Sequence, residues 1–433
     1  MSPAPSVAAT VASDALPTTE IDFDRDVRPI LADRCYQCHG PDPIGRTGDP
    51  ELRLDIADGL FSPRDGGSPV IPGKPSESAL LLRIIASDDE VRMPPPGDGR
   101  SRLSDKQIDI IRRWVRAGAV VPPVRPDGRF ARPANYPFPV DNAPTPDRVL
   151  LGKTLFFDPR LSGSNVMSCA ACHSPEFSWG DGEARSLGHG GVQLGRRTPT
   201  ILNLAWAELL FWDGRSASLE EQALGPIQSA AEMNQKLTDL RAELSAVAGY
   251  PRLFDLAYPG EGISDQTIGK ALAAYERTIV SGTAPFDRWA SGDESAMTQD
   301  AKRGFALFVG KAACIQCHTG WNFTDGGFYD IGLRGDDLGR GNLLKEIDVV
   351  QHAFKTPTLR NVGRRSPYMH DGSMATLSEV IDLYNRGGHV RRPSLSPQIK
   401  PLRLTAGEKQ DLIAFLRTLT SDDPRVVLPS LPK

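Results

Sequence analysis

The stretch CAACH, residues 169–173, holds two cysteines separated by two residues and followed at once by a histidine. The same frame returns in CYQCH (35–39) and CIQCH (314–318), and the three stretches contain all six cysteines of the chain. C-x-x-C-H is the attachment motif of c-type haem. Cysteines one helical turn apart reach the two vinyl groups of one porphyrin, and the adjacent histidine turns its imidazole onto the iron. The sequence therefore predicts three covalently bound haem c groups.

Zinc binding and disulfide formation account for less of this pattern. Zinc sites and redox-active pairs also use C-x-x-C, but no second pair lies close enough to complete a compact zinc site. Three disulfides would leave unexplained the three adjacent histidines, which are three of only seven in the chain. Haem attachment accounts for the whole motif. The predicted attachment residues are Cys35, Cys38, Cys169, Cys172, Cys314 and Cys317, and the predicted proximal iron ligands are His39, His173 and His318.

The composition is that of a globular protein, with 39% hydrophobic and 24% charged residues. The net charge of -4 and the lack of a basic run argue against nucleic-acid binding. No stretch approaches the roughly 20 consecutive apolar residues of a membrane span. Residues 1–20 lack the charged start and apolar middle of a signal peptide. Because haem c is attached outside the cytoplasm, we still expect an exported, periplasmic protein.

A chain of 433 residues is too long for one ordinary core. Alternating strand patterns are few, so we expect a mainly α fold of three cytochrome c-like haem domains with long loops. We expect the haem site to repeat without an extended repeat of sequence around it. The expected parts are a flexible terminus at 1–20, a monohaem module at 21–120, a proline-rich linker at 121–146, and two further haem domains at 147–297 and 298–425.

Two amphipathic helices are predicted near the ends of these domains. Ser104 and Gln107 have the spacing of a helix capping box, and Gly118 can end the helix that they begin. Thr405 and Glu408 have the same spacing before the apolar run of the last helix.

Residues 147–420 resemble the bacterial dihaem cytochrome c peroxidases and the related MauG group. The matching stretches are LGKTLFFDPRLSGSNVMSCAACH, RRTPTILNLAW, LFWDGRSASLEEQALGPIQSAAEMN, FKTPTLRNV and SPYMHDGSMATLSEVIDLY. Residues 22–120 resemble a small monohaem module, the planctomycete-type cytochrome c domain. Its matching stretches are FDRDVRPILADRCYQCHG, VIPGKPSESALLLRI and RMPPPG.

The resemblance implies a division of labour between two haems. The haem on His173 meets peroxide, and the haem on His318 passes electrons to it. Glu232 is implied as the carboxylate that moves a proton between the peroxide oxygens, and Gln222 as the amide that holds the developing charge. Trp212 is implied as an aromatic bridge between the haems. Without the resemblance, the first two would be read as solvated helix residues and Trp212 as a core residue.

Two residues divide the peroxidases from the MauG group. In the peroxidases a histidine at the position of His189 caps the sixth site of the peroxidatic haem, and the glycines around it permit such a loop to move. The alternative is a surface histidine in a glycine loop. Tyr384 stands where the peroxidases carry the methionine ligand of the second haem and where MauG carries tyrosine. A phenolate favours Fe(III) and lowers the potential, unlike a thioether. The alternative is a tyrosine that closes a helix face.

Two further ligand sites follow from the resemblance. Met93, in RMPPPG, is the implied distal ligand of the first haem opposite His39, and it otherwise packs on the core. The families hold a Ca²⁺ between their haems with an asparagine side chain and two carbonyls. Here those positions fall at Arg197, Arg365 and Pro367. Arginine adds positive charge where calcium needs oxygen ligands, so we expect no calcium of the usual kind.

The leading functional hypothesis is a periplasmic trihaem peroxidase that reduces H2O2 to water with electrons relayed through the first and third haems. The alternative is a MauG-like oxidase, which uses peroxide and a high-valent state of two haems to modify tryptophan or tyrosine of a partner protein. A plain electron-transfer cytochrome without an open iron fits less well. The expected partners are H2O2 and either a donor cytochrome or cupredoxin, or a small substrate protein. The families often form homodimers, and the sequence leaves the oligomeric state of this protein undecided.

Overall fold

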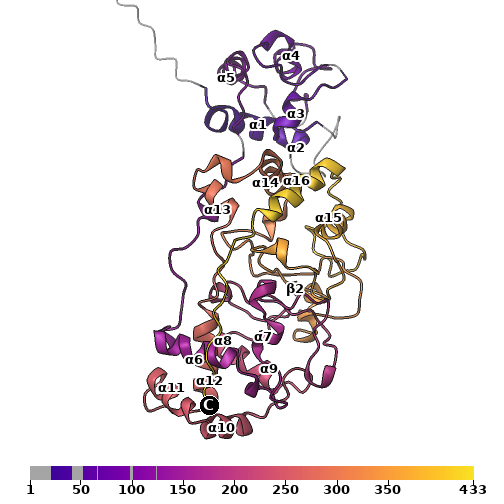
Figure 1. Ribbon diagram of the computed structural model, residues 1–433. Coiled ribbons are helices and arrows are strands. Elements are labelled where there is room, and N and C mark those ends of the chain that lie inside the picture. The colour runs from indigo at the N-terminus through magenta and orange to yellow at the C-terminus, as the bar shows by residue number, and fades with distance from the viewer. Residues whose placement is uncertain (1–20, 41–51, 66, 98–100, 123) are drawn as a thin grey trace, which may run out of the picture. The chain divides into compact units, whose positions relative to one another are not determined.

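The chain forms two compact units, residues 1–123 and 124–433, in the computed structural model (Figure 1). The structure describes residues 21–40, 52–65, 67–97, 101–122 and 124–433. The expected flexible terminus at 1–20 lies outside the described residues. Both units are mainly helical, which confirms the predicted fold class. No helix in the described ranges is long and apolar enough to cross a membrane.

The first unit surrounds a small core with short helices. Val27, Leu31, Leu60, Ile111 and Val115 are fully buried in this core. The predicted capping box is confirmed, since α5 begins after Ser104 with reciprocal bonds to Gln107, and Gly118 follows its end at a positive φ. The elements are the π-helix η1 (Phe23–Val27), α1 (Arg28–Arg34), α2 (Tyr36–His39), α3 (Ala57–Phe61), the 3-10 helix η2 (Pro75–Glu77), α4 (Ala79–Ile85) and α5 (Asp105–Arg116).

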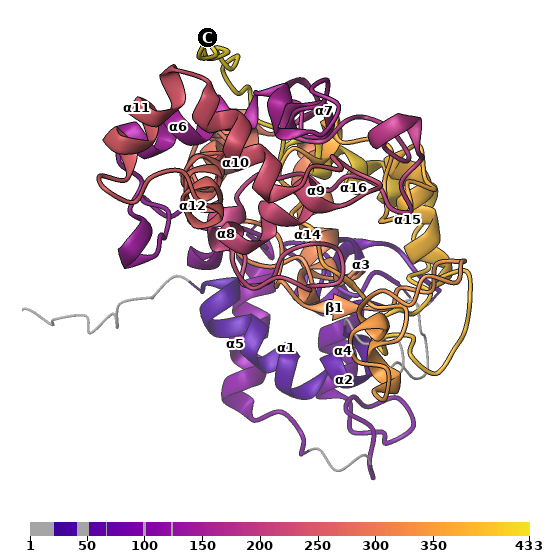
Figure 2. The same cartoon turned by 90° about the horizontal axis from the view of Figure 1, so that it is seen from below.

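The second unit is built from longer helices, one short hairpin and many single 3-10 turns (Figures 1 and 2). Its α-helices are α6 (Pro146–Phe156), α7 (Cys169–Cys172), α8 (Leu219–Gln222), α9 (Leu224–Gln228), α10 (Leu237–Ala246), α11 (Gly249–Ala257), α12 (Asp265–Glu276), α13 (Pro285–Ala290), α14 (Gln299–Val309), α15 (Leu377–Arg386) and α16 (Ala406–Arg417). The hairpin pairs β1 (Phe328–Tyr329) with β2 (Phe354–Lys355), antiparallel. The 3-10 turns are η3 (Gly128–Phe130), η4 (Val140–Asn142), η5 (Pro159–Leu161), η6 (Pro175–Phe177), η7 (His189–Gly191), η8 (Leu204–Trp206), η9 (Glu294–Ala296), η10 (Cys314–Gln316), η11 (Arg340–Asn342), η12 (Asp348–Val350) and η13 (Val362–Arg364).

The predicted linker is divided between the two units. Residues 124–146 belong to the second unit, where Phe130 packs against Phe286 and Phe323 in the apolar core. Asn142 is also buried, and its amide donates to Glu220 and to the carbonyl of Lys270. An extended, proline-rich chain can still bury the few large or polar side chains that find partners.

The second unit has two halves, one that contains α6 to α12 and one that contains α13 to α16. Each half is held together by one close pair of helices. α6 packs against α12 in the first half, and α14 packs against α16 in the second. A Cβ atom added to Gly152 on α6 would lie 1.9 Å from the carbonyl oxygen of Ala271 on α12. A Cβ atom added to Gly304 on α14 would lie 1.9 Å from the carbonyl oxygen of Asp411 on α16. Glycine is therefore required at both crossings, where the two backbones touch.

The expectation that only the haem site repeats was wrong. Residues 197–222 align with residues 355–380 without a gap, and both segments contain a 3-10 turn that follows a left-handed asparagine. Asn203 and Asn361, which end the two T-P-T-x-x-N stretches, are both left-handed, with φ of 62° and 56°. Ser218 and Thr376 then cap the helices α8 and α15. Identical residues are few in the repeat, which hid it in the sequence.

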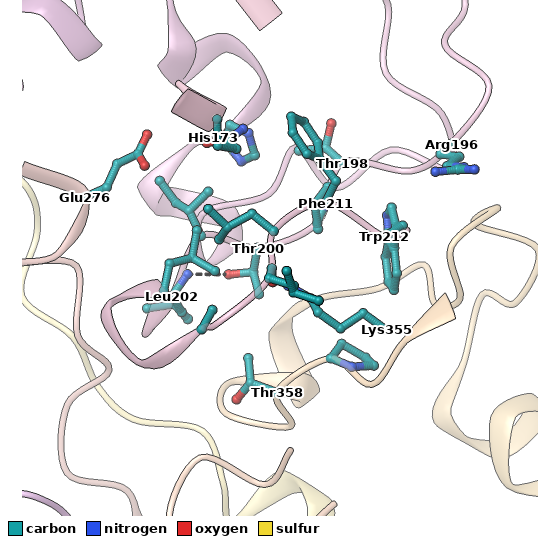
Figure 3. A pocket seen from close by; sticks show the side chains of 18 of the residues that line it. His173, Arg196, Thr198, Thr200, Leu202, Phe211, Trp212, Glu276, Lys355 and Thr358 are labelled. Carbon is teal, nitrogen blue, oxygen red and sulfur yellow. Dashed lines mark hydrogen bonds between the residues drawn. The ribbon is translucent and has the colours of Figure 1, made fainter. Parts of the chain in front are cut away.

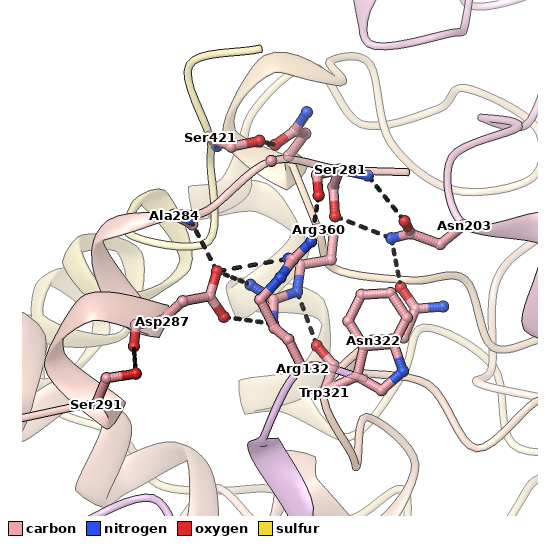
Figure 4. A network of polar contacts seen from close by, with 12 residues as sticks. Arg132, Asn203, Ser281, Ala284, Asp287, Ser291, Trp321, Asn322, Arg360 and Ser421 are labelled. Carbon is pink, nitrogen blue, oxygen red and sulfur yellow. Dashed lines mark hydrogen bonds and ion pairs between the residues drawn. The ribbon is translucent and has the colours of Figure 1, made fainter. Parts of the chain in front are cut away.

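A polar network joins the two halves (Figure 4). The side chain of Asn203 donates to Ser281 of its own half and to Asn322 of the second half, at 3.1 and 2.8 Å. Arg360 forms a buried ion pair with Asp287 on α13, at 2.8 Å, and the neighbouring Phe286 packs in the apolar core of the second half. Asn203 thus supplies the polar contact between the halves, and Figure 4 shows its side chain pointing toward Asn322.

Candidate functional site

The motif CAACH forms α7 and lies beside a cavity of about 840 Å³. Cys169, Cys172 and His173 all line this cavity, and Figure 3 shows His173 among the lining side chains. Nδ1 of His173 lies 3.2 Å from the carbonyl oxygen of Trp179, which leaves Nε2 as the nitrogen available to a metal. Burial lowers the pKa of His173, so the imidazole is in the neutral form that binds iron. These residues fit a haem attached at this cavity.

The motif CIQCH forms the corresponding centre of the second half. Nδ1 of His318 lies 3.0 Å from the carbonyl oxygen of Phe323, so this imidazole is oriented in the same way as that of His173. Burial raises the pKa of the Cys317 thiol to about 11 and that of Cys314 to about 12. Neutral, buried thiols are poor ligands for a bare metal ion. Both cysteines are free of disulfides, and both fit the thioether chemistry of haem c.

Tyr384, on α15, lies close to the cysteines of the second centre. Its phenol interacts electrostatically with Cys314 and Cys317, and burial raises its pKa. A buried phenol without a positive partner stays protonated, so phenolate at this position needs the charge of a metal ion. The internal repeat also supports a place for Tyr384 beside the second centre. Continuing the ungapped alignment brings Tyr384 opposite Pro226, which lines the cavity of the first half.

The residues that the resemblance implies for peroxide chemistry come together at the cavity of the first half. Trp212, Gln222 and Glu232 line it together with His173. Gln222 is the last residue of α8, and Glu232 follows α9. The break between these two short helices brings both side chains to the lining of the cavity. The indole of Trp212 is buried and donates a 2.8 Å hydrogen bond to the carbonyl oxygen of Arg197.

His189 lies next to this wall but outside the lining of the cavity, to which Gly188 contributes instead. The backbone N–H of His189 donates to the carbonyl oxygens of Ala231 and Glu232, at 3.2 and 2.8 Å. Its Nδ1 is buried and has no hydrogen-bond partner in the described residues. The loop is thus tied to the Glu232 segment, and ligation by His189 stays a prediction.

The cavity also contains two residues that the sequence did not indicate. Glu276, the last residue of α12, is buried, and its Oε2 meets no hydrogen-bond partner within the described ranges. Burial raises the pKa of Glu276 to about 8. Lys355 enters from the second half, and burial lowers its pKa to about 8. Figure 3 shows Glu276 near His173, and Lys355 at the other end. The internal repeat was the available signal, because it sets Lys355 opposite Arg197.

The first unit carries the remaining motif. Cys35 is buried in its core, and the backbone carbonyl of His39, at the end of α2, accepts a hydrogen bond from the N–H of Leu54 at 2.8 Å. Met93 follows α4 on a loop that is fixed by a bond from its backbone N–H to the carbonyl oxygen of Arg83, at 3.1 Å. The side chain of Met93 is half-buried, and its role as a ligand stays a prediction.

Comparison with known families and proteins agrees with this geometry. The family model for the di-haem cytochrome c peroxidases matches residues 146–295, and that for the planctomycete cytochrome C domain matches residues 35–97. The methylamine utilization protein MauG of Methylorubrum extorquens is 51% identical over 70% of this chain and 87% of its own length. The cytochrome-c peroxidase IdrP1 of Denitromonas iodatirespirans is 38% identical over 67% of this chain and 86% of its own.

Solved structures show the same relationship. The crystal structure of a MauG-like protein associated with microbial copper homeostasis matches with a TM-score of 0.62 and 34% identity, over 66% of this chain and 93% of that one. A variant of the diheme peroxidase BthA from Burkholderia thailandensis matches with a TM-score of 0.58 and 25% identity, over 64% of this chain and 86% of that one. The chain is thus a haem-dependent oxidoreductase that belongs to the di-haem cytochrome c peroxidase and MauG family and carries a planctomycete-type cytochrome c domain before it.

Proposed function

We propose that the protein is a periplasmic trihaem peroxidase, in which H2O2 is reduced at the haem attached to Cys169 and Cys172. The observation that carries this proposal is one cavity lined by His173, Glu232 and Gln222 together. Splitting of an O–O bond is assisted by a group that transfers a proton and by a donor that stabilises the developing charge, and a carboxylate and an amide can serve in these roles. The bound haem supplies the iron that coordinates peroxide and delivers the electrons.

The protein groups handle the protons. The carboxylate of Glu232 takes the proton from the oxygen nearer the iron and returns it to the farther oxygen, which leaves as water. The amide of Gln222 donates a hydrogen bond to the charge that develops during this transfer. The complete reduction of H2O2 to two waters consumes two electrons and two protons. The electrons come from a donor protein by way of the other haems.

The other haems form the route for these electrons. We assign the third haem to Cys314, Cys317 and His318, and the first to Cys35, Cys38 and His39. Trp212 lies on the cavity wall between the halves of the second unit and shortens the path between their haems. The cytochrome module is covalently tethered, which raises its effective concentration at the enzyme. It acts as the entry point for electrons from a periplasmic cytochrome or cupredoxin.

A second function is favoured by a specific observation. Tyr384 lies beside Cys314 and Cys317, and the chain is 51% identical to a MauG protein. If Tyr384 is a tyrosinate ligand of the third haem, it would lower the potential of that haem, and peroxide would then react without prior reduction. The protein would then oxidise tryptophan or tyrosine of a small partner protein, with peroxide as the oxidant.

One experiment separates the two functions. H2O2 is added to the fully ferric protein without reductant, and the reaction is followed by EPR and near-infrared absorption. For the peroxidase, we expect no reaction until one haem has been reduced, followed by turnover with a reduced donor cytochrome. A rapid and lasting loss of the ferric EPR signals would instead select the protein-oxidising function. Failure of peroxide to react in either redox state would reject both.

A further inference from the structure

Five positively charged side chains line the cavity between the halves of the second unit, and two of them, Arg196 and Arg215, form ion pairs with Asp213. The other three are Arg197 from the first half, and Lys355 and Arg365 from the second. Arg197 and Arg365 are only 5% and 6% exposed. Burial lowers the pKa of all three groups, to about 9 for Arg365 and about 8 for Lys355. Among the described residues, no carboxylate forms an ion pair with any of them. This part of the cavity therefore holds three cations that no described carboxylate neutralises by direct contact.

Arg197 connects the halves through its hydrogen bonds. Its guanidinium Nη2 donates to the carbonyl oxygen of Arg365, at 2.8 Å. Its backbone N–H donates to the carbonyl oxygen of His370, at 2.7 Å. Its own carbonyl oxygen accepts the indole N–H of Trp212, at 2.8 Å. One residue thus ties Trp212 of the first half to the segment between η13 and α15 of the second.

Lys355 makes the reciprocal contacts, as expected for the position that aligns with Arg197. Its Nζ donates to the carbonyl oxygen of Leu209 in the first half, and its backbone N–H donates to that of Trp212, both at 2.8 Å. Arg197 and Lys355 therefore form a pair of reciprocal contacts, called the clamp, between the two halves. Each cation reaches over the interface and binds a backbone carbonyl of the other half.

The residues at this interface do not fit calcium. The carbonyl of Arg365, a position at which the family binds the ion, already accepts a hydrogen bond from Arg197. Ca²⁺ requires six to eight oxygen ligands, and here it would face three cations. The described residues contain no cluster of three or more acidic, histidine or cysteine side chains that could hold a metal ion.

Arg197 and Arg365 each have an N–H donor without a hydrogen-bond partner among the described residues. The Nε groups of Arg197 and Arg365 are buried and meet no hydrogen-bond partner in the part of the chain that the structure describes. Nη2 of Arg365 donates to the carbonyl oxygen of Thr358, so only part of each guanidinium is used. A buried, unpaired guanidinium is costly unless an anion meets it, and its fork matches a carboxylate. Each haem brings two propionate carboxylates.

We propose that the Arg197 guanidinium, and not a calcium ion, joins the two haem-binding halves, and that Arg197 and Arg365 bind haem propionates. Arg197 is then a positioning residue, because it holds Trp212 and the carbonyl of His370 without touching peroxide. The inference requires the two haems of this unit but no particular reaction. It stands or falls independently of the proposed function.

The test uses the resting, ferric holoprotein without peroxide. The calcium content is measured before and after dialysis against EGTA, and EPR and absorption spectra are recorded with EGTA and with added Ca²⁺. We expect no bound calcium and no spectral change under either condition. About one calcium ion per chain, removed by EGTA with a change in the haem spectra, would overturn the proposal.

Variants test the role of the side chain. Arg197→Asn restores the amide oxygen of the family and removes the cation, whereas Arg197→Lys retains the charge. We expect altered EPR signals and reduction potentials in Arg197→Asn, a smaller change in Arg197→Lys, and a response to Ca²⁺ in Arg197→Asn alone. Arg160→Asn is the control, since Arg160 is half-buried beside Asp158 and does not line the cavity. If Arg197→Asn folds and its spectra match those of the parent protein, the guanidinium does not join the halves.

Discussion

The two halves of the second unit share one construction, and they differ where chemistry is expected. In both halves, a neutral histidine is oriented by a backbone carbonyl, a T-P-T-x-x-N stretch ends in a left-handed asparagine, and a capped helix follows. The first half breaks this helix into α8 and α9, and Pro226 faces the cavity. The second half continues α15, which carries Tyr384 at the aligned position. One scaffold thus carries a proline at this position in one half and a tyrosine in the other.

A second difference concerns buried charge. Glu276 at the end of α12 has Leu416 as its counterpart on α16, since α6–α12 and α14–α16 cross at equivalent glycines. The half with the open cavity therefore contains a buried carboxyl group, and the other half an apolar residue. The following variants test how far the comparison between the halves extends.

The largest effect is expected from Glu232. Glu232→Gln removes the group that transfers the proton, so the rate of peroxide reaction should fall by about 10²–10⁴-fold. The measurement is stopped-flow absorption in the haem bands after addition of H2O2. Glu208→Gln is the matched control, because Glu208 lines the same cavity but is exposed. Equal rates in the two variants would remove Glu232 from the mechanism.

The glycines at the helix crossings should come next. Gly152→Ala and Gly304→Ala each place a methyl group against a backbone carbonyl. Each should lower the free energy of unfolding by about 3 kcal/mol or more, as severe overpacking does. Thermal unfolding followed by circular dichroism measures this. Gly407→Ala on α16 is the control, since no atom of the described residues lies within 4 Å of its Cβ position. If only one of the two variants is destabilised, the halves are less alike than their helices indicate.

The reduction potential of the third haem should depend on Tyr384. Tyr384→Met replaces a phenolate with a thioether and should raise this potential by a sizeable part of the roughly 0.8 V range that axial ligands span. Spectroelectrochemical titration, haem by haem, is the measurement. In the control Tyr368→Phe, the lost hydroxyl donates to the carbonyl oxygen of Val362. An unchanged potential in Tyr384→Met would mean that the second half is closed by another residue.

The last expected effect is a change of stability with pH caused by Glu276. The folded protein keeps the proton on Glu276 up to a pKa of about 8, whereas the unfolded chain loses it above about 4.5. The stability contributed by the neutral carboxyl is complete below pH 4.5 and is lost progressively as the pH rises to 8, by up to about 1.4 kcal/mol per pH unit. Glu276→Gln should therefore gain melting temperature over the parent protein as the pH rises from 5 to 8.

Glu220→Gln serves as the control with the opposite sign. Although burial acts to raise the pKa of Glu220, its hydrogen bonds from Arg277 and Asn142 lower it overall. The stability from this ion pair is present above the unfolded pKa and is lost as the pH falls. A melting temperature for Glu276→Gln that follows the parent protein at every pH would show that Glu276 is ionised in the folded protein.

The sequence by itself determined the helix ends and was sufficient to predict the haem centres. The motif C-x-x-C-H spans five residues, because a single turn of the chain supplies both thioether cysteines and the histidine that binds iron. The capping boxes at Ser104 and Thr405 are equally local, and both formed as predicted. Leu412, Leu416 and Leu419 are buried on one face. Local spacing is sufficient where the partners of an interaction lie within one or two turns of each other.

Only the tertiary structure decided what surrounds these centres. The repeat of residues 197–222 in 355–380 became visible through shared backbone angles and caps, because most side chains in it differ. The clamp by Arg197 and Lys355, and the burial of Glu276, depend on elements that meet across the unit. Their charges are set by the loss of water and by carbonyls from distant parts of the chain. Such environments arise only when the halves pack against each other, so no local sequence pattern could predict them.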